Sequence, residues 1–225
     1  MTGCQKNTIY GSGLQVEDVR TINGIYNSVS VHDGLMLVID TTLEENMVAI
    51  RCDEEILSNV TLKIRMNELN VGYKNNFTFQ TPLITEIRIP DSPMITEFKL
   101  HRSTMIANSR IERDSVILSA EHSSVKIAGQ IDYLDLKAEK GSIVTLQGFA
   151  RNSTFLLSKS VVNDEGFYTD YCRATLVDSF LKLGCNTSLT ATLSERSRLE
   201  YYGAAQTQIK KSDDSETTFY TDSEL

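Results

Sequence analysis

The sequence contains little of what several large classes of protein require. It holds 22 Lys and Arg against 30 Asp and Glu, a net charge of −8, so it lacks the basic surface that nucleic-acid binding needs. No apolar run approaches the roughly 18 residues of a membrane span, and the densest stretch, Gly34–Ile39, has only the length of a strand. Nucleic acid as a partner and a membrane-spanning helix are therefore both excluded.

Cysteine is scarce, and the four cysteines lie far apart in the chain. They are Cys4, Cys52, Cys172 and Cys185. This spacing fits neither a C-x-x-C metal pattern nor a dense disulfide framework, and it predicts isolated buried thiols. Cys4 is the exception, because Thr2-Gly3-Cys4 resembles the end of a bacterial lipoprotein signal, where a small residue precedes the cysteine that is lipidated. We therefore expect lipidation at Cys4 and a leader that is trimmed from this sequence.

Motifs for catalysis and for cofactors are missing as well. The sequence has no Gly-x-Ser-x-Gly nucleophile turn and no phosphate-binding glycine loop. Among the three histidines, His101 and His122 have no third metal ligand beyond Glu121. We therefore predict no catalytic residue, no metal site and no cofactor.

What the sequence does contain is a pattern of alternating apolar residues. Hydrophobic residues make up 40% of the 225 positions, which is enough for a sizeable core. The apolar positions have period two nearly throughout, as in Val60–Met66, Ile84–Ile89 and Leu134–Ala138, and no stretch has the period of a long amphipathic helix. The fold class is predicted to be all-β.

Serine and glycine recur at a nearly constant spacing in the second half of the chain. Each series has a step that varies by no more than one position from one member to the next. The serines are Ser124, Ser142, Ser160, Ser179 and Ser197, and the glycines are Gly129, Gly148, Gly166, Gly184 and Gly203. We expect the five serines to form one column in tight turns.

This repeat indicates stacked coils. A single coil cannot bury its apolar face alone, so coils of constant length stack on one another. A β-sandwich is the alternative, but it does not need regular serines and glycines. Because aliphatic residues do not recur at every sixth position, we predict a right-handed parallel β-helix, or solenoid, with about 18 residues per coil and two possible lobes.

Proline and charge divide the chain further. All three prolines, Pro82, Pro90 and Pro93, lie close together and indicate a seam between two lobes. The predicted segments are an N-terminal anchor or linker over 1–19, a first β lobe over 20–90, a repeat lobe over 91–208, and a disordered acidic tail over 209–225.

The sequence resembles the head GIN domain of putative auto-transporter adhesins, a family of unknown function in Bacteroidetes. The resemblance covers about residues 20–208 and rests on Ile22–Val31, on His32-Asp33-Gly34 and on the closing Tyr201-Tyr202-Gly203. The family's repeated Ser-Gly-Ser-Gly turn survives only as Gly141-Ser142. The resemblance implies an exported and usually lipid-anchored β-helix, and its motifs concern turns rather than active-site chemistry.

Aromatic residues provide the best candidate for a binding site. Phe167, Tyr168 and Tyr171 surround Gly166, where the repeat is least regular, and flat rings bind partners at little cost in entropy. Charged neighbours would complete the patch: Asp164, Asp170 and Arg173. The alternative is that these three rings belong to the core of a coil.

The expected function is that of a non-enzymatic, adhesin-like binding module. It would contact a polysaccharide or a surface protein from the periplasm or the outer membrane of a Gram-negative bacterium. Two other functions stay open. One is a polysaccharide lyase or hydrolase that uses Asp164, Asp170 and Arg173 on an acidic face. The other is a purely structural spacer.

Overall fold

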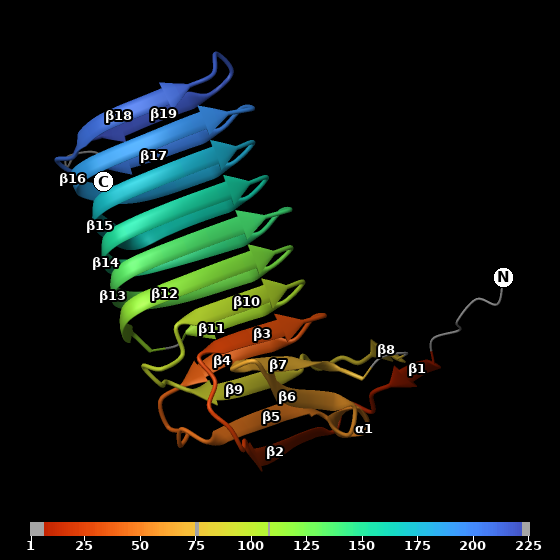
Figure 1. Cartoon of the computed structure of the whole chain (residues 1–225). Helices are drawn as coiled ribbons and strands as arrows, with labels where there is room; N and C mark the ends of the chain where they lie inside the picture. The colour runs from red at the N-terminus through yellow and green to blue at the C-terminus, as the bar shows by residue number, and fades with distance from the viewer. Residues whose placement is uncertain (1–6, 75–76, 108, 222–225) are drawn as a thin grey trace.

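The chain forms a parallel β-solenoid, as the repeat predicts. The computed structural model describes residues 7–74, 77–107 and 109–221, and Figure 1 shows its coils stacked from β3 at the bottom to β19 at the top. The structure is 70% strand and 2% helix, with about six turns of about 19 residues each. The regular spacing of serine and glycine therefore reported the length of one coil.

Each complete coil consists largely of one long strand that bends near its middle. The first half of the strand lies on one face of the solenoid and the second half lies on the other. The long strands are β12 (Ile111–Glu121), β13 (Ser124–Glu139), β14 (Ile143–Ser158), β15 (Val161–Val177) and β16 (Phe180–Ser194). Each pairs in parallel with the next. Alternate side chains point inward, and Phe155 and Leu157 of β14 are fully buried.

Shorter strands form the coils at both ends of this stack. Below it lie β3 (Ser28–His32), β4 (Met36–Asp40), β10 (Glu97–His101) and β11 (Thr104–Ala107). Above it lie β17 (Arg198–Tyr202), β18 (Gln206–Lys211) and β19 (Glu216–Tyr220). β3 pairs in parallel with β10, and β4 pairs with β11, so segments on both sides of the proline-rich seam join directly. The division into two lobes at residue 90 stays a prediction.

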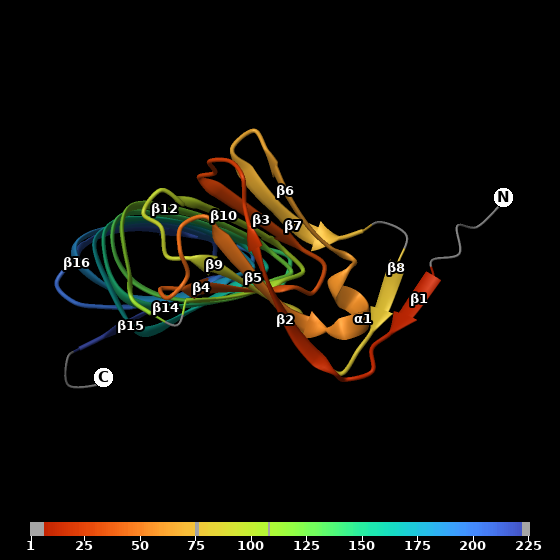
Figure 2. The same ribbon diagram turned by 90° about the horizontal axis from the view of Figure 1, so that it is seen from below.

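The N-terminal part mixes parallel and antiparallel pairing. Its remaining elements are β1 (Asn7–Tyr10), β2 (Gln15–Thr21), β5 (Met47–Asp53), α1 (Glu54–Leu57), β6 (Val60–Arg65), β7 (Glu68–Tyr73), β8 (Phe77–Gln80) and β9 (Glu86–Pro90). β2 pairs antiparallel with β5, whereas β1 and β8 form a separate two-stranded sheet. Figure 2 shows β1, β8 and α1 beside the superposed coils. No helix in the described ranges is long and apolar enough to cross a membrane.

A column of buried serines lines one corner of the solenoid. The backbone N–H of Ser160 donates to Oγ of Ser179 at 3.2 Å, and that of Ser179 donates to Oγ of Ser197 at 3.4 Å. The predicted column is correct for four of its five members. The fifth is wrong by one position, because Ser123 occupies the corner below Ser142 while Ser124 faces outward beside Ile143. A slip of one position moves a strand side chain to the opposite face.

Two predicted segments are wrong at the ends of the chain. The described part of the segment 1–19, expected to be an anchor or linker, contains β1 and most of β2, and Arg20 in β2 pairs with Asp18 at 2.7 Å. In the expected disordered tail, β18 and β19 stack on β16 and β17. Ser215, which lies one further step of the serine series beyond Ser197, is buried and continues the column. Backbone pairing with a preceding coil orders these polar strands although they contain few apolar side chains.

Candidate functional site

The predicted aromatic patch divides between the core and the surface. Phe167 is 2% exposed and packs edge-on against Phe155, with ring centroids 6.5 Å apart. Its assignment to a binding patch is therefore wrong, because an inward side chain of β15 cannot reach a partner. Tyr168 and Tyr171 are 40% and 50% exposed. The Tyr168 ring stands edge-on to Tyr202 at 5.2 Å, at the bend of the coil.

Asp164 has a structural role at the same bend. Its carboxylate accepts hydrogen bonds from the backbone N–H of Phe167 and from the hydroxyl of Tyr202. Burial, together with the neighbouring Asp164 carboxylate, raises the pKa of Tyr202 far above its ordinary value, so the hydroxyl stays protonated and keeps donating. The register between β14 and β15 shifts beside Leu146. Asp164 accepts the hydrogen bond of the Phe167 N–H at this shift.

The three charged residues of the predicted acidic site do not come together. Asp164 binds Tyr202, whereas Asp170 accepts a hydrogen bond from Nδ2 of Asn186 at 3.3 Å. Arg173 stands on the outward side of β15, beside Thr154 and Thr190 of the neighbouring strands. This arrangement does not provide the paired carboxylates that a glycosidase requires.

Tyr171 belongs instead to a column of outward side chains on three consecutive strands. Tyr133 of β13 pairs with Asn152 of β14, and Asn152 pairs with Tyr171 of β15. Tyr133 is 60% exposed, so at least half of each tyrosine is open to solvent. Nδ2 of Asn152 donates to the carbonyl of Asp132 at 3.4 Å, which orients the amide between them.

A second column of polar side chains lies beside the first. Two positions further along the same strands, Asp135, Thr154 and Arg173 are paired in register. They offer, in order, an acceptor, a hydroxyl that donates and accepts, and a donor. Neither Asp135 nor Arg173 forms an ion pair with another residue in the described part of the chain. We call these six residues, Tyr133, Asn152, Tyr171, Asp135, Thr154 and Arg173, the tyrosine face.

Four residues of the tyrosine face were missed as site residues by sequence reasoning. They are Tyr133, Asn152, Asp135 and Thr154. The sequence did contain a signal for these positions, because the three residues of each column follow one another at a constant spacing. That spacing equals the length of one coil. Residues separated by one coil length lie above one another, so either set of three predicts a column once the coil length is known.

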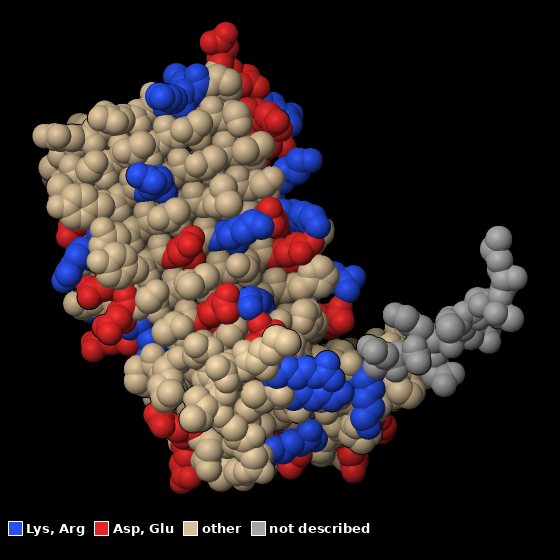
Figure 3. Space-filling model, in the orientation of Figure 1, with Lys and Arg blue, Asp and Glu red and all other residues tan. Residues whose placement is uncertain are grey.

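Charge around the tyrosine face is unevenly distributed. Figure 3 shows the outer side of this part of the solenoid, where charged side chains gather over the lower coils and along the edge formed by the turns. The upper coils are largely uncharged on this side. Several of the lower charges neutralise one another, as Lys137 does with Glu139 at 2.9 Å and Lys99 with Glu68 at 2.6 Å.

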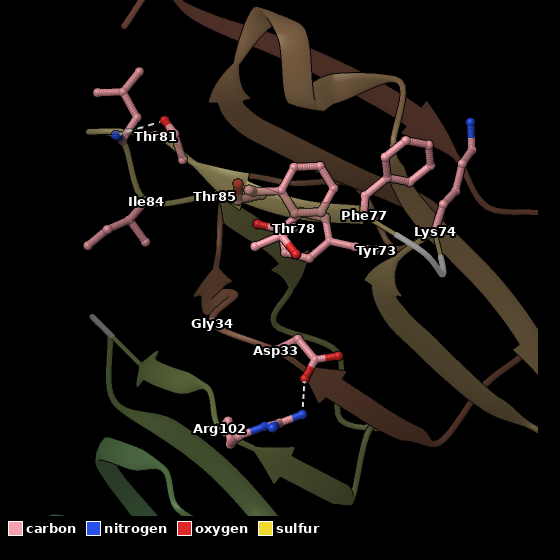
Figure 4. A pocket seen from close by; sticks show the side chains of 12 residues that line it. Asp33, Gly34, Tyr73, Lys74, Phe77, Thr78, Thr81, Ile84, Thr85 and Arg102 are labelled. Carbon is pink, nitrogen blue, oxygen red and sulfur yellow. Dashed lines mark hydrogen bonds and ion pairs between the residues drawn. The ribbon is translucent and has the colours of Figure 1, made fainter. Parts of the chain in front are cut away.

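A cavity of about 660 Å³ in the N-terminal part is a second candidate site. Figure 4 shows Tyr73 and Phe77 on one side of it and the ion pair of Asp33 with Arg102 on the other. Phe79 packs against Tyr73 and Phe77, with ring centroids 4.3 and 6.3 Å apart. These rings attach β8 to β7. The guanidinium of Arg102 already pairs with the carboxylate of Asp33, at 2.5 Å between Nη2 and Oδ1. The tyrosine face is therefore the better candidate.

Solved structures of bacterial proteins share this fold. A "putative adhesin" from Bacteroides fragilis aligns with a TM-score of 0.80 and 13% identity over 94% of this chain and 100% of that one. A "putative adhesin" from Parabacteroides merdae gives 0.68 and 16% over 95% and 99%. A "putative lipid binding protein" from Parabacteroides distasonis gives 0.75 and 11% over 95% and 100%.

Sequence comparison identifies the family. No curated protein matches the chain. The model of the family described as putative auto-transporter adhesin, head GIN domain, matches residues 25–205. That range contains the long strands β12 to β16, the serine column from Ser123 to Ser197 and the whole tyrosine face. The chain therefore belongs to the head GIN domain family of putative auto-transporter adhesins.

Proposed function

We propose that this chain is an exported, adhesin-like module that binds a surface polysaccharide through the tyrosine face without cleaving it. The observation that supports the proposal is the pair of half-exposed tyrosines in one column, Tyr133 and Tyr171. Exposed tyrosines on a rigid scaffold bind partners at low entropic cost, because they have few rotatable bonds to order. The family of adhesins supports a binding role and an extracytoplasmic location.

Binding to immobilised polysaccharides tests this function. The double variant Tyr133→Ala and Tyr171→Ala is expected to lose at least tenfold in affinity, or about 1.4 kcal/mol, as hot-spot residues do. Tyr10→Ala is the matched control, because Tyr10 is 68% exposed but lies on β1. The wild-type chain is expected to release no new reducing ends from the bound polysaccharide.

Three results would contradict the proposal. Unchanged binding by the double variant would show that the tyrosine face is not the contact surface. Release of sugar by the wild-type chain would favour a polysaccharide-active enzyme. Loss of binding only to a protein partner would keep the tyrosine face but replace the polysaccharide.

The proposal includes a lipid anchor at Cys4, which lies outside the described residues. It is supported by Thr2-Gly3-Cys4 in the sequence. When the source cells are grown with an alkyne-labelled fatty acid, the wild-type chain is expected to carry the label and to sediment with membranes. Cys4→Ser is expected to do neither. A wild-type chain that stays unlabelled, in cells whose other lipoproteins are labelled, would refute the anchor.

A further inference from the structure

We propose that the tyrosine face takes an uncharged, extended polysaccharide of β-linked pyranose rings, which runs across the strands and parallel to the solenoid axis. This inference deepens the proposed function and rests on it. It is carried by the spacing of Tyr133 and Tyr171, by the polar column beside them and by the balance of charge on that column.

The spacing of the two tyrosines matches alternate rings of such a chain. Tyr133, Asn152 and Tyr171 occupy successive strands, so the Cα atoms of the tyrosines are two strand spacings apart, about 9.6 Å. In an extended β-1,4-linked chain, each pyranose ring advances by close to one strand spacing and turns over relative to the ring before it. Every second ring therefore presents the same apolar face, and two such rings would lie on Tyr133 and Tyr171.

The ring between them would lie over Asn152. It would turn its opposite face toward the sheet, with its equatorial hydroxyls at the edge of the ring, where the amide of Asn152, which already donates to the carbonyl of Asp132, offers a polar partner. A third aromatic ring at this position would meet the opposite face of the sugar. The order of tyrosine, asparagine and tyrosine thus follows the alternation of the polysaccharide.

Peptide partners fit the same column less well. Side chains on one side of an extended peptide recur at every second position, about 6.8 Å, which falls between one and two strand spacings. Helical partners usually lie in an apolar groove, whereas Tyr133 and Tyr171 are 60% and 50% exposed on the outside of a continuous sheet. The spacing therefore favours a sugar chain over a peptide.

The polar column explains why the sugar should be uncharged. Asp135 and Arg173 stand at the two ends of the column, with the hydroxyl of Thr154 between them. Their charges cancel, so a neutral chain gains hydrogen bonds from both ends. A polyanion would gain at Arg173 but would be repelled by Asp135 and by the net charge of −8.

Binding of defined hexasaccharides tests the inference. The probes are β-1,4-linked hexamers of glucose, xylose, mannose and N-acetylglucosamine, with maltohexaose as the α-linked comparison and a β-1,4-linked hexaglucuronate as the anionic one. Because the chain has no tryptophan, its tyrosine fluorescence reports binding, and calorimetry confirms it. At least one β-linked hexamer is expected to bind tenfold or more tightly than both comparisons.

A pair of rescue variants tests the spacing itself. In the register of the sheet, Ser188 lies one strand above Tyr171 and Gln206 lies two strands above it. Tyr133→Ala is expected to weaken the best hexamer at least tenfold. Adding Gln206→Tyr restores a two-strand spacing and is expected to recover several-fold of that loss, whereas adding Ser188→Tyr is expected to recover none.

The outcomes separate this inference from the proposed function. Equal rescue by Ser188→Tyr, equal binding of maltohexaose, preference for the hexaglucuronate, or failure of every uncharged β-linked hexamer would each overturn the inference. If polysaccharide arrays still show binding that depends on both tyrosines, the proposed function survives such a result. If the double variant binds those arrays as well as the wild type does, the proposed function has failed.

Discussion

Gly148→Ala is expected to lower the free energy of unfolding by about 3–6 kcal/mol, because two costs coincide at this position. Gly148 has a φ of +104°, a conformation that L side chains rarely adopt. A Cβ atom there would lie 2.1 Å from the carbonyl oxygen of Gly129, the residue paired with it on the coil below. A backbone oxygen in the sheet cannot move away as a flexible side chain can.

Gly166→Ala is the matched control for this prediction. Gly166 has a φ of +91°, yet a Cβ atom there would have no other atom within 4 Å. It is expected to cost only the strain of the left-handed backbone, about 1–2 kcal/mol. Urea denaturation followed by circular dichroism measures both variants. Equal losses of stability in the two variants would show that the contact with Gly129 is unimportant.

Phe167→Ala is expected to lower the free energy of unfolding by about 3–5 kcal/mol and to leave the binding site intact. The ring is 2% exposed and packs against Phe155, so its removal leaves a cavity between coils. Tyr171→Ala, further along the same strand, is expected to change stability by only about 0.5 kcal/mol. Its ring is half-exposed and leaves no enclosed cavity.

Stability and binding should therefore separate along β15. Denaturation curves and affinities for the bound polysaccharide, measured well below the unfolding transition, are expected to show opposite effects for the two variants. Phe167→Ala would be less stable with unchanged affinity, and Tyr171→Ala would be stable with weakened affinity. The prediction would be contradicted by a stable Phe167→Ala variant that has lost affinity.

The same strand shows which residues of the predicted site face outward and which do not. Tyr171 and Arg173 are outward residues on a regular stretch, so both stay available to a partner. Asp164 and Phe167 lie at the register shift beside Leu146, where the carboxylate is engaged by a backbone N–H and the ring turns inward. An irregular repeat in the sequence suggests a binding site, but here it marks a bulge with a structural cause.

The ends of the chain illustrate a different limit of sequence reasoning. The tail that begins at position 209 has few apolar side chains and is acidic between Ser212 and Leu225, which is typical of disorder. Its strands nevertheless form, because β16 and β17 present in-register backbone partners to them. Ser215 indicated that the repeat continues into the tail, since it extends the serine series by a further step of the same length.

The sequence by itself determined that the chain is an all-β solenoid with coils of nearly constant length. Alternating burial, serine in the turns and glycine at the bends are each required at the same place in every coil. These residue types therefore recur in the sequence with the period of one coil. Only the tertiary structure decided the register, and with it the choice of Ser123 over Ser124 and the placement of Tyr133 in one column with Tyr171. The physical reason is that successive strand side chains point to opposite faces, so a shift of one position moves every side chain from the core to the surface.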